Sequence, residues 1–186
     1  MSSHKPALII VDVQCGFDHP RWGSRNNPAA ESNIATLLAA WRKAGAPVFH
    51  FRHDSVLPES PLRPGQPGNQ IRPEAAPAPG EPVFGKNVNS CFIGTPLEAE
   101  LRQRGIQKLV VVGLTTDHCV STTVRMAGNL GFQVWVASDA TATFERTGPD
   151  GSRFPAEEMH RTALASLHDE FATVGTTADI LKLLAS

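Results

Sequence analysis

The chain has 186 residues, and its 17 Lys and Arg against 18 Asp and Glu give a formal net charge of -1. This balance argues against a nucleic acid or an anionic membrane as partner, because both require a basic surface. No apolar run approaches the roughly twenty residues of a membrane span. We therefore expect a cytoplasmic protein that acts on a small-molecule substrate, and one domain over residues 1–186, since no composition shift marks a boundary.

The first half of the chain alternates strand and helix patterns before a long irregular stretch. Residues 7–13 are a continuous apolar run that includes Asp12 near its end, typical of a central parallel strand covered on both faces. Asn27 and Pro28 are predicted to begin a helix that ends at Gly45. Residues 47–51 follow as a strand. Residues 58–82 contain eight prolines in 25 residues, which predicts a long surface loop.

The alternation resumes after this loop. Residues 83–86 end with Lys86, and Thr95 to Glu98 have the spacing of a capping box that begins a helix to about residue 104. A strand over 108–113 is followed by a short turn and by Cys119, which is predicted to open a helix ending near residue 131. Strands at 133–137 and 171–174 and helices at 156–168 and 177–184 complete the pattern. This order predicts a three-layer α/β/α sandwich around a central, mostly parallel sheet.

Three chemically active side chains follow strands of this predicted sheet. Asp12, Lys86 and Cys119 should lie at the carboxyl edge, where parallel sheets bind ligands. A free thiol has a pKa of about 8.5, so it needs a base or a nearby cation to become a nucleophile. We expect Asp12 to take the proton and Lys86 to stabilise the anion. A helix N-terminus and Lys86 should together lower the pKa of Cys119, although Asp12 opposes them.

Several motifs in order resemble the isochorismatase-like cysteine hydrolases, and the resemblance covers nearly the whole chain. They are residues 9–14 with Phe17, Lys86 with residues 90–97, residues 113–120 and residues 138–140. The resemblance implies an Asp12–Lys86–Cys119 triad and a cis peptide bond before Thr115. It also implies an oxyanion hole made by the backbone amides of Thr115 and Cys119.

The resemblance does not extend to a metal site. Nicotinamidases of this superfamily carry an Asp-x-His metal motif after the second strand, whereas this chain has the segment His50-Phe51-Arg52-His53-Asp54. His50 and His53 on one strand would point to opposite faces, which argues against a shared metal. We therefore expect no metal and no cofactor.

Other residues near the predicted edge are candidates for substrate contacts. Gln14, Phe17 and Trp22 follow the Asp12 strand, although simple packing of the loop is the alternative for Phe17 and Trp22. His118 is assigned to the pocket wall or to an interface, because side chains adjacent in sequence at a helix start seldom face each other. Asp139 is interpreted as a structural hydrogen-bond acceptor.

The presence of Cys119 favours hydrolysis of a C–N bond in a small amide, ureido or carbamoyl compound through a covalent acyl-enzyme. Isochorismatase-type hydrolysis of a vinyl ether by Asp12 and Lys86 alone is the alternative, and a non-catalytic binding or scaffold protein is a third. We also expect a homo-oligomer, a dimer or tetramer. In it the loops 54–82 and 141–155 would bury Leu62, Phe144 and Phe154 against a neighbour.

Overall fold

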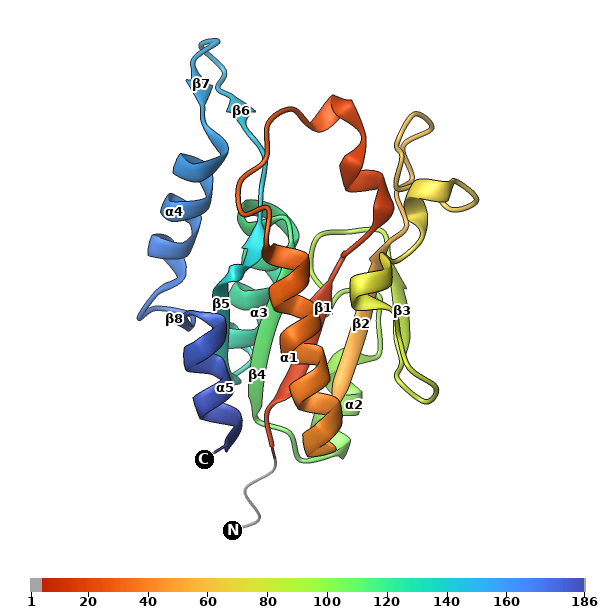
Figure 1. The fold of residues 1–186 in the computed structure, drawn as a ribbon, viewed down its shortest axis with the longest axis vertical. Coiled ribbons are helices and arrows are strands. Elements are labelled where there is room, and N and C mark those ends of the chain that lie inside the picture. Colours follow the sequence, from red (N-terminus) through yellow and green to blue (C-terminus); the bar gives the residue numbers. More distant parts are fainter. Residues whose placement is uncertain (1–4, 186) are drawn as a thin grey trace.

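Six parallel strands form the central sheet of the computed structural model, which describes residues 5–185 (Figure 1). The strands are β1 (Ala7–Val11), β2 (Val48–His53), β3 (Val83–Lys86), β4 (Lys108–Leu114), β5 (Gln133–Ala142) and β8 (Thr173–Gly175). Their order across the sheet is β3-β2-β1-β4-β5-β8, and every pairing in it is parallel. The predicted parallel sheet is confirmed.

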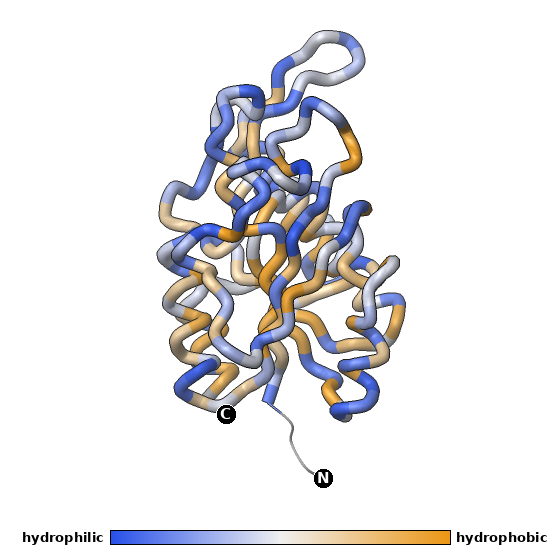
Figure 2. Tube along the Cα trace, turned by 90° about the vertical axis from the view of Figure 1, so that its right-hand side faces the viewer, coloured by the Kyte–Doolittle hydropathy of each residue, from blue (hydrophilic) through white to orange (hydrophobic). Residues whose placement is uncertain are grey.

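Helices cover both faces of the sheet, which confirms the predicted three layers. One face carries α1 (Ala30–Ala44) and α5 (Thr177–Ala185), which lie in front in Figure 1, and the other carries α2 (Leu97–Gln103), α3 (Ser121–Asn129) and α4 (Ala156–Leu167). Successive residues of β1 alternate between the two layers. Ile9 packs in the cluster of α2, α3 and α4, whereas Ile10 packs in that of α1 and α5. Figure 2 shows the resulting apolar centre.

The chain changes direction across the sheet between β1 and β4. β1 leads through α1 to β2 on one side, whereas β4 leads through α3 to β5 on the other. The connections therefore diverge beyond the carboxyl ends of these two strands, and this is where parallel sheets form a ligand crevice. The long loops after β1, β2 and β5 gather at this end of the molecule (Figure 1).

Two predicted helix starts are wrong. α1 begins at Ala30 with Ala29 as N-cap, because the side chain of Asn27 is used elsewhere. Nδ2 of Asn27 donates to the backbone oxygens of Ser138 and Thr141, at 3.0 and 2.7 Å, and so connects the segment before α1 to β5. The expected capping box is also absent: α2 begins at Leu97 with Pro96 as N-cap, and the hydroxyl of Thr95 accepts the N–H of Leu97 at 3.3 Å while it donates to the Cys91 carbonyl.

The strand ends also differ from the prediction. β2 continues to His53 instead of ending at residue 51, and β5 continues to Ala142 instead of residue 137. β8 begins at Thr173, two residues later than expected. Pairing with a neighbouring strand decides these ends, since β2 pairs with β3 as far as the register His53 with Lys86.

The two long loops pack on their own chain. The 54–82 loop contains 3-10 turns at Pro67–Asn69 and Pro73–Ala75, and the 141–155 segment contains an antiparallel ribbon of β6 (Arg146–Thr147) and β7 (Arg153–Phe154). Leu62 and Phe144 are 4% and 2% exposed in the core against α1, so they are not available to a neighbouring subunit. This removes two of the three apolar contacts expected in a homo-oligomer, whereas Phe154 is half-buried, and the homo-oligomer itself stays a prediction. Among residues 5–185, no helix is both long and apolar enough to cross a membrane.

A half-buried carboxylate, Glu81, joins the end of the proline-rich loop to α1 and β2. Glu81 accepts hydrogen bonds from Arg42 in α1 at 2.8 Å and from the backbone N–H of Ala78 at 2.8 Å, and its Oε2 lies 2.8 Å from Nε2 of His50. The Arg42 bond is the strongest of these influences and holds the pKa of Glu81 at about 2. Glu81 therefore stays charged in the folded state at pH values where it would be protonated in the unfolded chain.

The Glu81 contacts predict a pH-dependent loss of stability on substitution. Glu81→Gln should lower the free energy of unfolding at pH 7 by about 1–3 kcal/mol, because the buried His50 and the exposed Arg42 both lose a charged partner. The folded-state pKa lies below the ordinary value of 4.5, so this contribution is complete above pH 4.5 and disappears as the pH falls toward 2. Urea unfolding should show the two proteins converging in that range. A difference that stays constant down to pH 3 would contradict the assignment.

Candidate active site

Asp12 stands at the first position after β1, in a left-handed backbone conformation with φ of 51°. The residue is fully buried, and its backbone N–H donates to the carbonyl of Phe51 at 3.0 Å. Its Oδ2 accepts a hydrogen bond from Nζ of Lys86 at 2.6 Å. Its Oδ1 has no hydrogen-bond partner among the described residues. One carboxylate oxygen is therefore held by Lys86 while the other is free to accept a proton.

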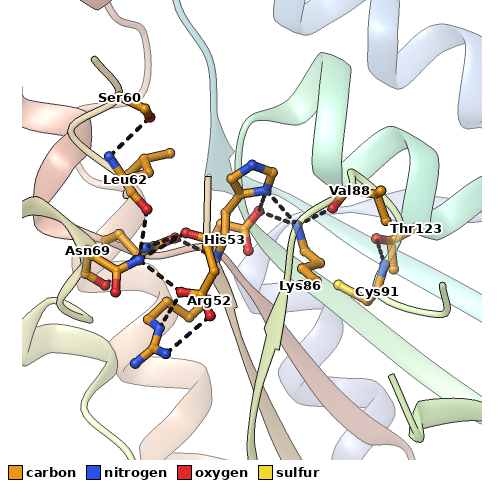
Figure 3. A network of polar contacts seen from close by, with 12 residues as sticks. Arg52, His53, Ser60, Leu62, Asn69, Lys86, Val88, Cys91 and Thr123 are labelled. Carbon is orange, nitrogen blue, oxygen red and sulfur yellow. Dashed lines mark hydrogen bonds and ion pairs between the residues drawn. The ribbon is translucent and has the colours of Figure 1, made fainter. Parts of the chain in front are cut away.

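Lys86, the last residue of β3, is the cation of this buried pair (Figure 3). Its ammonium contacts Oδ2 of Asp12 at 2.6 Å, the carbonyl of Val88 at 3.2 Å and Nδ1 of His53 at 3.4 Å. Burial is the largest single influence and opposes the charge, but Asp12 and the neighbouring Cys119 and Cys91 together outweigh it, so the pKa of Lys86 lies above its ordinary value. The side chain is thus a permanent cation.

Cys119 lies in a π-helical turn, Thr116–Val120, that precedes α3. The N–H of Val120 bonds the carbonyl of Thr115 five residues earlier, so the turn is wider than an α-helical one. Cys119 therefore does not open an α-helix as predicted, although it stands two residues before one. Its sulfur, a ring nitrogen of His53 and a carboxylate oxygen of Asp12 all lie within 4.8 Å of one another. The peptide bond between Leu114 and Thr115 is cis.

The electrostatics of the thiol are opposite to the prediction. Burial raises the pKa of Cys119, and the negative charge of Asp12 raises it further, while the opposing effect of Lys86 is smaller. The expected depressed pKa is therefore wrong, because a thiol that is 8% exposed gains little from a helix terminus. The resting thiol keeps its proton, and the Asp12 carboxylate close to it is its hydrogen-bond acceptor.

Two contacts from distant elements anchor the turn that carries Cys119. Nδ1 of His160, a buried residue of α4, lies 2.9 Å from the hydroxyl of Thr116. Asp117 accepts hydrogen bonds from Thr143 and from Nε of Arg146, the latter at 3.0 Å. The sequence patterns indicate no role for either anchor, and no motif marks Arg146. Both contacts join segments that are more than twenty residues apart.

The placement of Gln14 argues against the predicted substrate contact. The residue is fully buried, and its Oε1 accepts the backbone N–H of His53 at 2.8 Å. Its Nε2 donates to the carbonyls of His53 and Asn69, at 3.1 and 2.9 Å. All of its polar atoms are therefore used by the backbone, so Gln14 joins the end of β2 to the proline-rich loop instead of facing a ligand.

The other predicted substrate contacts have different surroundings. Phe17 packs against Trp22 and Phe144, with ring centroids 5.4 and 5.9 Å apart, and Nε1 of Trp22 donates to the Gly16 carbonyl. This arrangement corresponds to loop packing, the alternative to a substrate contact. His118 is 57% exposed in its side chain and lies 3.6 Å from Asp117, so a role in the pocket wall or an interface stays a prediction.

Asp139 has the structural role that the sequence indicated. Its Oδ1 accepts hydrogen bonds from the backbone N–H and the hydroxyl of Thr177, both at 2.7 Å, and so fastens the start of α5 to β5.

His53 is a site residue that the sequence patterns did not reveal. It contacts Lys86 and, at 4.0 Å, Oδ2 of Asp12, whereas His50 is turned to Glu81. Asp12, His53 and Cys119 are a possible ligand set for zinc. However, the ammonium of Lys86 already contacts both Oδ2 of Asp12 and Nδ1 of His53, at 2.6 and 3.4 Å. This donor set therefore fits an ion pair better than a metal, and metal-free chemistry stays a prediction.

Comparison with known proteins assigns the chain to a family. The model of the Isochorismatase domain matches residues 6–179. The chain belongs to the isochorismatase family. The family protein YrdC of Bacillus subtilis is 47% identical over 95% of each chain. A family structure from Chromobacterium violaceum is 51% identical with a TM-score of 0.95, and the match covers 100% of this chain and 96% of that one. This chain is a hydrolase of that family.

Two further isochorismatase relatives have names that state an activity. Ureidoacrylate amidohydrolase RutB of Methylobacterium radiotolerans is 33% identical over 92% of this chain and 76% of its own. The secreted isochorismatase effector Isc1 of Verticillium dahliae is 32% identical over 96% of this chain and 92% of its own. One of these names states an amidohydrolase and the other an isochorismatase.

The raised pKa of the thiol predicts how Cys119 reacts with an alkylating agent. The rate of iodoacetamide alkylation should inflect above the free-thiol value of about 8.5, because burial and Asp12 disfavour the thiolate. Asp12→Asn should move the inflection to lower pH by removing the negative charge. Peptide mass spectrometry can follow Cys119 separately, with the half-exposed Cys15 as the reference thiol in the same chain. An inflection below 8.5, or one that Asp12→Asn leaves in place, would refute this account.

Proposed function

We propose that this hydrolase cleaves the C–N bond of a small amide, ureido or carbamoyl compound with Cys119 as nucleophile. The observation that carries the proposal is the buried Asp12 carboxylate beside the Cys119 thiol: one of its oxygens lies within 4.8 Å of the sulfur, and Oδ1 has no other hydrogen-bond partner in the described chain. A carboxylate that holds Lys86 with one oxygen and offers the other to a protonated thiol is a suitable general base. The name of the relative RutB supports an amide-type substrate.

The geometry supports a two-step mechanism. Oδ1 of Asp12 accepts the thiol proton as the sulfur attacks the carbonyl carbon, so the thiolate forms only during attack. The resulting oxyanion is stabilised by the backbone amides of Thr115 and Cys119. The C–N bond then breaks, and Asp12 returns the proton to the leaving nitrogen, which leaves a thioester on Cys119.

Hydrolysis of the thioester completes the cycle. Asp12 takes a proton from a water molecule, which attacks the thioester carbonyl, and the C–S bond breaks. The proton returns to the sulfur, and the acid product leaves. Lys86 remains charged throughout and stabilises Asp12 in each step in which the carboxylate is negative. The cycle consumes one water molecule and needs no redox partner.

Vinyl-ether hydrolysis is a second candidate, and the relative Isc1 favours it. In that reaction Asp12 would protonate the substrate, and the sulfur would take no covalent part. The two candidates therefore differ in their dependence on Cys119. A non-catalytic family member would show neither activity.

Turnover of amides should depend on the sulfur. A panel of primary amides and ureides, ureidoacrylate among them, should contain a substrate that can be identified by the release of ammonia. With this substrate, Cys119→Ala should reduce turnover by at least about a thousandfold. Cys15→Ala is the matched control, since Cys15 lies outside the Asp12–Lys86–Cys119 cluster, and it should retain activity. Intact-mass measurement of the wild type during turnover should show an acyl adduct. Amide turnover that persists in Cys119→Ala would contradict nucleophilic catalysis by Cys119, whereas a lack of turnover of any amide together with cleavage of a vinyl ether would favour the second candidate.

Removal of metal should leave the activity intact. The cation of the site is Lys86, so amide hydrolysis should survive exhaustive treatment with a strong zinc chelator. The measurement is the turnover rate before and after treatment, together with elemental analysis of the protein. Stoichiometric zinc or iron whose removal abolishes turnover would disprove the metal-free mechanism.

A further inference from the structure

We propose that His53 is a positioning residue for the catalytic ion pair, and that its Nδ1 is the third acceptor of the Lys86 ammonium and keeps Lys86 directed at Asp12. The proposal rests on the proposed function only in treating Asp12 as the base. The physical arrangement of the three side chains can be tested without a substrate.

The strand register places His53 beside Lys86. β2 and β3 are paired so that His53 is the direct partner of Lys86, and the side chains of such a pair leave the sheet on the same face. Figure 3 shows the imidazole and the ammonium turned toward each other, with 3.4 Å between Nδ1 and Nζ. The register therefore makes this contact, and a shift of one residue would remove it.

The hydrogen bonds of Lys86 define the protonation state of the ring. An ammonium has three N–H donors and no acceptor, so Nδ1 of His53 must accept, and the neutral ring carries its proton on Nε2. With Oδ2 of Asp12 and the carbonyl of Val88, Lys86 then has three acceptors for three donors. Loss of one acceptor would leave a buried charged donor unpaired, which is costly and lets the ammonium turn away.

The backbone of His53 is fixed more firmly than its position at a strand end requires. Its N–H and its carbonyl are both bound by the amide of Gln14, and Nδ2 of Asn69 donates to the same carbonyl at 3.1 Å. The imidazole is 18% exposed, whereas the side chains of Asp12 and Lys86 are 0% exposed. The backbone that carries the ring is thus held in place, and the ring is more exposed than the two charged side chains that it contacts.

The charges that face the ring come from four elements. Asp12 after β1 and Asp54 after β2 favour a protonated imidazole, Lys86 in β3 opposes it, and the uncharged Cys119 lies within 4.8 Å in the turn before α3. Burial is the largest influence and lowers the pKa of His53 below 6.5. The ring is therefore neutral at pH 7. Protonation at lower pH would place a donor on Nδ1, so the ring could no longer accept from Lys86 and its positive charge would repel the ammonium.

Two substitutions separate the acceptor from the bulk of the ring. In His53→Asn the side-chain oxygen can replace Nδ1 as acceptor and cannot titrate, whereas His53→Leu has similar bulk and no acceptor. In the 15N-labelled full chain, the ammonium resonance of Lys86 should be visible near neutral pH, because this lysine is buried and fully hydrogen-bonded. The signal that is missing from Lys86→Met is thereby assigned to Lys86. This ammonium signal should persist in His53→Asn and disappear in His53→Leu.

Alkylation of Cys119 provides a second readout. Lys86 lowers the pKa of the thiol, so a loosened ammonium should slow iodoacetamide alkylation at pH 8. Relative to Cys15, the rate at Cys119 should fall about tenfold in His53→Leu and stay near the wild-type rate in His53→Asn. Equal rates and an intact Lys86 signal in His53→Leu would overturn the proposal.

The wild-type protein alone provides a test that does not depend on folding of a variant. Nitrogen chemical shifts should show the His53 proton on Nε2, and a proton on Nδ1 at neutral pH would overturn the proposal. None of these measurements uses a substrate. A failure to find amide turnover would therefore contradict the proposed function without affecting this result, and the reverse also holds.

Discussion

The buried ion pair between Asp12 and Lys86 is the interaction on which the site depends. Removing two charges from water is expensive, and the Coulomb attraction offsets that cost only if the remaining donors and acceptors are also satisfied. Lys86 meets this condition through Val88 and His53. Asp12 does not, because its Oδ1 has no hydrogen-bond partner in the described chain. The unsatisfied oxygen belongs to the carboxylate that lies beside the Cys119 thiol.

The sheet topology explains why these residues meet. Asp12 and Cys119 follow β1 and β4, the two central strands at which the connections diverge, while Lys86 reaches in from the edge strand β3. Rigid strands on either side hold the reacting groups, and the layers of helices exclude water from behind them. A site built on strand ends is positioned more accurately than one built on loops alone.

The raised pKa of Cys119 changes how the site is expected to work. A thiolate formed in advance would stand close to the Asp12 carboxylate, and burial would make this repulsion strong. A thiol that loses its proton to Asp12 during attack avoids placing two negative charges side by side. The contacts of Thr116 with His160 and of Asp117 with Arg146 then matter, because they anchor the turn that carries the sulfur and so fix its position relative to Asp12.

The sequence by itself determined the layers, the strand order along the chain and the positions of Asp12, Lys86 and Cys119, because apolar runs and strand-end motifs are local patterns. Only the tertiary structure decided that Gln14 serves the backbone, that Leu62 and Phe144 are buried within the chain, and that His53 joins the site. It also reversed the direction of the thiol pKa. These properties depend on strand register, on burial and on charges brought together from distant segments, which no local pattern records.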